Sequence, residues 1–172
     1  MKKLLIVLSL ILVCASSVSA QKIKKKEVDK FTKAEIVETS VESLYKQNFM
    51  MSGFTNIFEC CIRKTNGLYV MPANILTKEV EKYTEDSGVT FLLDNDDTVT
   101  LTTAYTGISG DKFGNGYWFN TAFNLSEDDV VKLKNNKVVS IRVSYLGGNY
   151  DHDVKGKKQE VIAKMLKLVD GE

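Results

Sequence analysis

The sequence has 172 residues, 44% of them hydrophobic, with 23 basic and 22 acidic residues and a formal net charge of +1. This length suits one domain with a substantial core. A near-neutral chain has no electrostatic footprint for nucleic acid, so we expect no nucleic-acid partner.

The N-terminus has the pattern of a cleavable export signal. Two lysines follow Met1, Leu4–Val13 is apolar apart from one serine, and small residues lead up to Ala20. This order is typical of a secretory signal peptide, and the apolar run is shorter than the roughly 20 residues of a membrane helix. We therefore predict a signal peptide over residues 1–20 and export to the periplasm or the medium.

Lipid anchoring through Cys14 is the alternative. Bacterial lipoproteins are cut before such a cysteine, after Gly, Ala or Ser, whereas Val13 stands there in this chain. Cleavage after Ala20 is therefore favoured. It leaves 21 basic against 22 acidic residues, and no second apolar run predicts a transmembrane segment in the mature chain.

Residues 21–26 are rich in lysine and are predicted to form a basic leader, followed by a single domain over 27–172. Glu27–Thr32 is a weak candidate for a short edge strand. Ala34–Tyr45 is rich in β-branched residues and is predicted to be a strand, although its apolar steps of three and four also suit a helix.

Phe54–Arg63 alternates between apolar and polar residues, which predicts a half-buried strand with Cys60 pointing inward. Asn66-Gly67 then predicts a hairpin turn. Leu68–Ile75 is the expected return strand, and Pro72 favours an edge position for it, because proline cannot donate to a ladder.

The two cysteines of the mature chain, Cys60 and Cys61, are neighbours and cannot build a disulfide framework. Side chains of neighbouring residues in a strand point to opposite faces, so a bond between them needs a distorted turn. We expect two free thiols.

Thr77–Gly88 is polar and ambiguous. Val89–Leu93 and Thr98–Thr106 are predicted to form a second hairpin, and Gly107–Gly116 a glycine-rich loop. Tyr117–Asn124 is the next expected strand.

Ser126 can cap a short helix that ends at Asn135-Asn136. Lys137–Leu146 is β-branched and predicts a strand. Lys157–Val169 has an apolar stripe at helical spacing and predicts a C-terminal helix packed on the sheet. The predicted class is α+β: six or seven mostly antiparallel strands, with a short helix before the last strand and the C-terminal helix on the same face.

Four stretches of the mature chain carry a resemblance to other proteins: Val28–Thr32, Phe91–Asp94 leading into Thr98–Leu101, Leu125-Ser126 and Val139–Arg142. Through them the mature chain resembles a group of small uncharacterised exported proteins of gut Gram-negative anaerobes. The group has no assigned activity, so the resemblance implies a fold and a compartment and no chemistry.

His152 is the one histidine, and acids flank it at Asp151 and Asp153. Such a residue can act as a base or bind a metal, but adjacent side chains in extended chain cannot turn to one ion, and no second histidine completes a zinc set. A solvated loop is the favoured interpretation. Pairing of His152 with Cys61 as base and nucleophile lacks any supporting spacing.

The stretch from Asp94 to Asp97 superficially suggests calcium, but an EF-hand's spaced glycine and distant glutamate are missing, and a turn is favoured. We expect no metal and no cofactor.

The aromatic strand Tyr117–Asn124 provides the best functional candidate. Tyr117, Phe119, Thr121 and Phe123 share the face expected to enter the core. The opposite face carries Trp118, Asn120 and Asn124, residue types that can stack on a sugar ring or anchor a protein. The alternative is that the C-terminal helix covers this face and that Trp118 is core.

The leading hypothesis is a non-catalytic exported binding module, with a glycan or a protein as the partner of Trp118, Asn120 and Asn124. An envelope-associated enzyme that uses His152 and nearby acids is one alternative. A structural partner in an envelope assembly is another.

Overall fold

The structure is a computed structural model. It describes residues 21–49, 54–77, 87–103, 111–113, 116–145 and 148–172. The strands are β1 (Ile23–Val28), β2 (Glu35–Thr39), β3 (Glu42–Phe49), β4 (Phe54–Cys60), β5 (Arg63–Thr65), β6 (Leu68–Thr77), β7 (Gly88–Leu93), β8 (Thr98–Thr102), β9 (Asp111–Phe113), β10 (Gly116–Leu125), β11 (Val138–Tyr145) and β12 (Gly148–Asp153). The helices are α2 (Glu127–Asn135), the 3₁₀-helix η1 (Gly156–Glu160) and α3 (Val161–Asp170).

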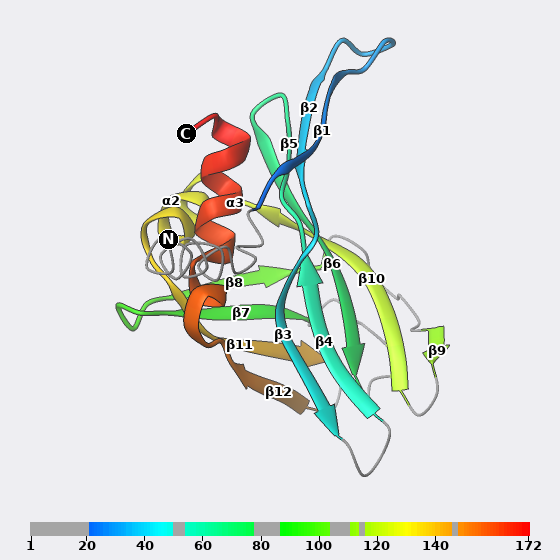
Figure 1. Cartoon of the computed structure of the whole chain (residues 1–172), viewed down its shortest axis with the longest axis vertical. Coiled ribbons are helices and arrows are strands. Elements are labelled where there is room, and N and C mark those ends of the chain that lie inside the picture. The colour runs from blue at the N-terminus through cyan, green and yellow to red at the C-terminus, as the bar shows by residue number, and fades with distance from the viewer. Residues whose placement is uncertain (1–20, 50–53, 78–86, 104–110, 114–115, 146–147) are drawn as a thin grey trace, which may run out of the picture.

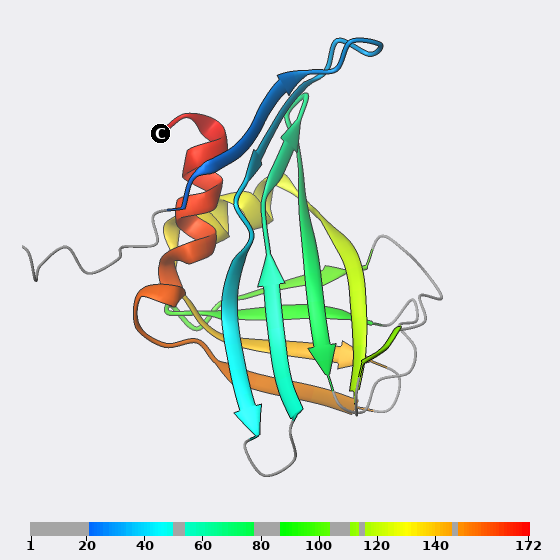
Figure 2. The same ribbon diagram turned by 45° about the vertical axis from the view of Figure 1, so that its right-hand side comes forward.

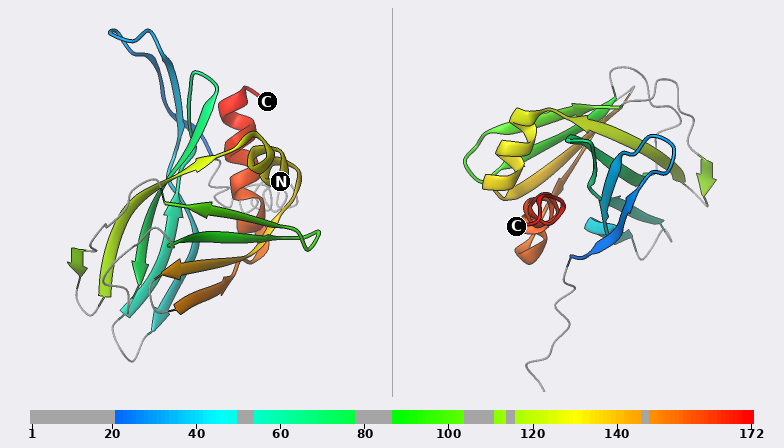
Figure 3. Two further views of the ribbon diagram at one scale, coloured as in Figure 1. Left: turned by 180° about the vertical axis from the view of Figure 1, so that it is seen from behind. Right: turned by 90° about the horizontal axis from the view of Figure 1, so that it is seen from above.

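Two antiparallel sheets pack against each other. The larger has eight strands in the order β1-β2-β5-β6-β10-β9, with β4 paired to β6 and β3 to β4; the smaller has the order β12-β11-β7-β8. The strands of the smaller sheet run across those of the larger sheet (Figure 1, and from above in Figure 3). The side chains between the sheets form the core, where Phe58 of β4 meets Phe91 of β7 edge to face with ring centroids 6.1 Å apart.

The two α-helices form where their ends and apolar stripes predict them. Ser126 and Asp129 cap α2 reciprocally, because the Ser126 hydroxyl accepts from the Asp129 amide and the Asp129 carboxylate accepts from the Ser126 amide. Gly171 ends α3 with a left-handed φ of 80°. Five residues of α3 are buried where it packs beside α2 and β2: Val161, Ile162, Met165, Leu166 and Val169.

The coarse fold prediction is confirmed: the described chain is mostly antiparallel sheet with few helices, one of them C-terminal. The expectation of six or seven strands in one sheet was too simple. The predicted strand Ala34–Tyr45 divides into β2 and β3 at Ser40 and Val41, which belong to neither strand. At this break the backbone amide of Thr39 donates to the carbonyl of Ile62, and its hydroxyl accepts from the amide of Ile62, so the chain changes pairing partner here.

The prediction for Pro72 was wrong. It lies in β6, which pairs with β10 on one side and with β4 and then β5 on the other. The Pro72 carbonyl accepts from the amide of Cys61, between the end of β4 and the start of β5. The nitrogen of a strand residue faces the same side as its carbonyl, so the missing N–H falls where the ladder is already interrupted.

The prediction of a basic leader over residues 21–26 was wrong. Most of this segment belongs to strand β1, an exposed edge of the large sheet. The signal segment 1–20 and most of 77–88 and 107–116 lie outside the described residues. Among the helices of the described part, none is long and apolar enough to cross a membrane.

Candidate functional site

The aromatic strand β10 places its side chains as the alternation predicts. Phe119, Thr121 and Phe123 are buried between the sheets. Trp118 is partly exposed, and Asn120 and Asn124 are exposed, on the outer face of the large sheet. The period of two is kept because one face of β10 packs on the core while the other meets solvent.

Neighbouring strands extend this outer face in two rows. In the first row, Trp118 pairs with Leu76 of β6, which pairs with Ile57 of β4. Residues directly opposite in antiparallel strands lie close enough for their side chains to touch. Leu76 is buried and Ile57 is partly exposed, so the indole stands at one end of a small apolar strip.

The second row is polar. Asn120 pairs with Asn74 of β6, which pairs with Glu59 of β4, and Asn74 and Glu59 are partly exposed. Two amides and a carboxylate therefore stand beside the apolar strip. We call the two rows, Ile57, Leu76, Trp118, Glu59, Asn74 and Asn120, the Trp118 face.

The Trp118 ring is held in place from its own strand. Its Nε1 donates a hydrogen bond to Oδ1 of Asn120 at 3.1 Å. Asn120 thus uses its acceptor on the indole and keeps its amide nitrogen, which has two protons to donate. Asn124 lies four residues further along β10, opposite Val70, and extends the same polar side.

The C-terminal helix does not cover this face. Helix α3 packs against α2 and β2, and β5 and β6 separate β2 from β10 (Figure 2). The alternative that α3 makes Trp118 a core residue is therefore wrong.

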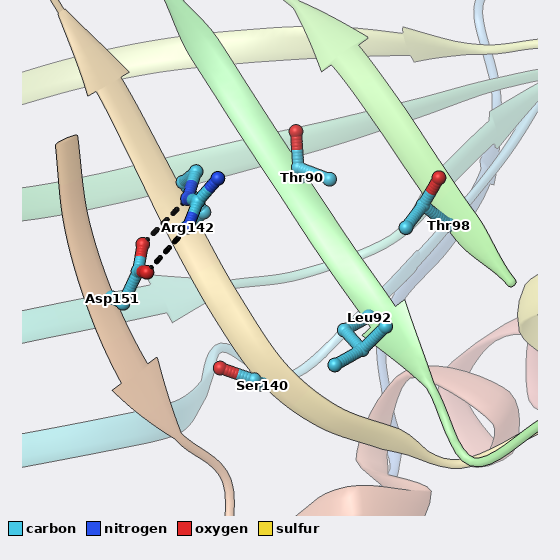
Figure 4. A pocket seen from close by; sticks show the side chains of 6 residues that line it. All are labelled: Thr90, Leu92, Thr98, Ser140, Arg142 and Asp151. Carbon is cyan, nitrogen blue, oxygen red and sulfur yellow. Dashed lines mark hydrogen bonds and ion pairs between the residues drawn. The ribbon is translucent and has the colours of Figure 1, made fainter. Parts of the chain in front are cut away.

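The outer face of the small sheet holds a shallow hollow of about 250 Å³, lined by Thr90, Leu92, Thr98, Ser140, Arg142 and Asp151 (Figure 4). Arg142 and Asp151 form a two-pronged ion pair with N–O distances of 2.7 and 2.6 Å. These hydrogen bonds lower the pKa of Asp151 and raise that of Arg142. Each partner satisfies the other, and the rest of the lining is Leu92 together with two threonines and a serine. The Ser140 hydroxyl donates to the carbonyl of His152 and the Thr90 hydroxyl bonds that of Thr100, so the hollow has no free charged group.

His152 lies in edge strand β12, so the prediction of a solvated loop was wrong. Its ring stacks on Tyr45 of β3 with centroids 3.9 Å apart, and its Nε2 is buried without a hydrogen-bond partner. Burial lowers the pKa of His152, and the carboxylates of Asp151 and Asp153 oppose this shift.

A hollow of about 480 Å³ lies beside this ring, lined by Tyr45, Lys46, Asp151, His152, Asp153 and Lys155. Neighbouring side chains on β12 point to opposite faces, and the Asp151 carboxylate is held by Arg142 on the outer face. The flanking acids therefore do not converge on the imidazole as an acid–base pair requires.

The cysteines are free and buried, as expected for Cys60; Cys61, which the alternation placed outward, is buried too. Burial raises the pKa of both thiols. Since the thiolate is the nucleophile, this environment opposes a catalytic role for either residue.

The run of acids at 94–97 is a hairpin turn between β7 and β8. Asn95 Oδ1 accepts from the backbone amide of Asp97, and Asp94 Oδ1 from the amide of Lys137. The side-chain oxygens of Asp94 and Asn95 thus accept from the backbone. Within the described ranges no cluster of three ligand residues could hold a metal ion.

Comparison with protein-family models, curated proteins and solved structures finds no match for the chain. The assignment of the candidate site therefore depends on the geometry of its residues. The sequence pattern predicted Trp118, Asn120 and Asn124 as site residues but not Glu59 and Asn74. The alternation of their strands marks them as outward-facing, but only the register of β4, β6 and β10 brings them beside Asn120.

Proposed function

We propose that this protein is a non-catalytic exported binding module that uses the Trp118 face as its site. The observation that carries the proposal is the partly exposed indole on the outer face of the large sheet, oriented by a hydrogen bond to Asn120. An aromatic ring fixed in advance loses little conformational entropy on binding. Export rests on the basic, apolar and small-residue order of residues 1–20.

A glycan is the partner class that suits this face best. A sugar ring has an apolar side that stacks on an indole and equatorial hydroxyls that pair with amides and carboxylates. Trp118 supplies the stacking surface, while Asn120, Asn74 and Glu59 supply donors and acceptors on neighbouring strands. Asn124 extends the polar side for a longer chain.

The test is binding to a panel of immobilised glycans, followed by calorimetry on any hit. Trp118→Ala should weaken binding about 30-fold, because a central aromatic anchor contributes about 2 kcal/mol or more. Trp118→Phe should keep part of the affinity, since it retains a ring. Leu92→Ala, on the outer face of the other sheet, is the matched control and should bind as the wild type does.

Unchanged affinity in Trp118→Ala, with the fold intact by circular dichroism, would refute the Trp118 face as the site. The enzyme alternative predicts that His152→Ala abolishes a turnover that Trp118→Ala leaves intact. The structural alternative predicts that both variants still co-purify with an envelope assembly.

A further inference from the structure

The hairpin of β1 and β2 projects from the body of the protein, beyond the end of the β5–β6 hairpin (Figures 1 and 2). Its strands pair from Ile23 with Thr39 to Val28 with Glu35, and β1 is an edge of the large sheet. The turn that joins them, residues 29–34, is therefore the outermost point of this end of the molecule.

The turn is rigidly built. Oδ1 of Asp29 accepts three hydrogen bonds: from the amide of Phe31 at 2.9 Å, and from the amide and hydroxyl of Thr32 at 2.7 and 2.9 Å. Two backbone bonds of 2.8 Å close it, from Lys33 to Asp29 and from Asp29 to Ala34. Such an Asx turn holds its conformation without support from a core.

This turn presents a large apolar side chain to solvent. Phe31 is 86% exposed at the tip, and Val28, where β1 ends, is 62% exposed. Folding removes little of this phenylalanine from water, whereas burying one stabilises a complex substantially. A fixed turn with an exposed aromatic at its apex is therefore suited to insertion into another phase or molecule.

The apolar tip is surrounded by positive charge. Residues 22–35 contain six lysines and three acids. In the described part of the chain, ion pairs of this hairpin engage Lys24, Lys25 and Lys26 but neither Lys30 nor Lys33, which flank Phe31. The carboxylate of Asp29, which precedes Lys30, accepts the hydrogen bonds of the turn. The ammonium group of Lys30 lies 5.9 Å from the centre of the Phe31 ring, and that of Lys33 donates to the carbonyl of Lys30 at 3.0 Å. Both positive charges are thus held at the tip, which offers an anionic partner two cations.

We propose that the β1–β2 hairpin docks on an anionic lipid surface, with Phe31 inserted at the interface and Lys30 and Lys33 on the headgroups. A protein interface needs about 800 Å² per partner around a packed centre, more than one convex turn provides. A bilayer interface instead accommodates a single inserted ring and neighbouring lysines, each contributing independently. This inference does not depend on the ligand of the Trp118 face.

The test is co-sedimentation of the purified protein with vesicles of phosphatidylglycerol and phosphatidylcholine, compared with phosphatidylcholine alone. Binding should require the anionic lipid and weaken with salt. Phe31→Ala should lose about 10-fold in affinity. Lys30→Gln and Lys33→Asn should each lose about 5-fold; asparagine tolerates the left-handed backbone of Lys33, whose φ is 59°.

Val131→Ala is the control, because Val131 is 57% exposed on α2, away from the hairpin, and should bind as the wild type does. Brominated lipids should quench emission in Phe31→Trp and leave the wild-type emission of Trp118 unchanged.

Absence of wild-type binding to anionic vesicles would overturn the proposal, as would equal binding by Phe31→Ala. If the wild type does not bind lipid, its sedimentation coefficient without vesicles can be compared with that of Phe31→Ala. A difference between the two would instead assign the tip to contact with a second copy of the chain.

Discussion

Replacing Asp170 with asparagine tests how the C-terminal helix is held to the sheets. Asp170, the last residue of α3, accepts hydrogen bonds of 2.6 Å from Lys64 of β5, Lys134 of α2 and Tyr69 of β6. One carboxylate thus joins both helices to the large sheet. Asp170→Asn keeps the shape of the side chain and removes the charge that pairs with two lysines.

The pKa of Asp170 gives the expected magnitude. Burial alone would raise it, but the hydrogen bonds from Lys134, Lys64 and Tyr69 prevail and lower the pKa from 3.8 to about 2. Each pKa unit corresponds to about 1.4 kcal/mol, so ionised Asp170 contributes about 2 kcal/mol to folding at neutral pH. The side chain is only 13% exposed, so solvent screens this interaction little.

The sign of the pH dependence follows from the depressed pKa. The contribution is fully present above pH 3.8, where the unfolded carboxyl is ionised, and is lost as the pH falls from 3.8 through about 2. Urea unfolding followed by Trp118 fluorescence measures it at pH 7, 5 and 3. Asp170→Asn should be about 2 kcal/mol less stable at pH 7 and 5, and the difference should shrink at pH 3.

The matched control is Asp151→Asn, which breaks the ion pair with Arg142. Both of those side chains are about half exposed, at 54% and 52%, and exposed pairs contribute about 0–1 kcal/mol. A deficit in Asp170→Asn no larger than in this control, or one that stays constant down to pH 3, would refute the electrostatic argument.

Two further predictions concern groups whose burial shifts their pKa. Cys60 and Cys61 should not react with a disulfide reagent at pH 8 in the native protein and should react once urea unfolds it, because burial keeps them as thiols; rapid native labelling would contradict this. His152→Phe should keep the stack on Tyr45 and remove a titration: since burial lowers the pKa of His152 below 6.5, wild-type stability should fall relative to this variant as the pH drops below 6.5. Urea midpoints at pH 7.5 and 5.5 measure the difference, and equal pH slopes in the two proteins would count against it.

The elements that could be predicted are those specified by local sequence. Asn66 and Gly67 have φ values of 49° and 83° in the turn between β5 and β6, as an Asn-Gly hairpin requires. Ser126 caps α2 because its own hydroxyl reaches the amide of Asp129. In β10, the alternation alone separates the core residues from the Trp118 face.

The sheet arrangement could not be predicted, because it depends on pairings between distant residues. Nothing local divides Ala34–Tyr45 at Ser40; the division follows from Thr39 bonding to Ile62, 23 positions away. His152 looked like a loop residue because its neighbours are Asp and Tyr, yet pairing of β12 with β11 makes it a strand residue. Its stack on Tyr45 joins two sheets, a contact that no local pattern encodes.

The register of β6 relates the Trp118 face to the hairpin tip. Trp118 lies opposite Leu76, near one end of β6, whereas Leu68 begins β6 at the end from which the β1–β2 hairpin projects. Eight residues of strand separate Leu68 from Leu76, about 26 Å at 3.3 Å per residue. A protein docked through Phe31 would therefore hold the Trp118 face clear of the lipid surface. Simultaneous binding is the consequence: vesicle-bound protein should take up a glycan with the same affinity as free protein, and competition between the two would mean that they share a site.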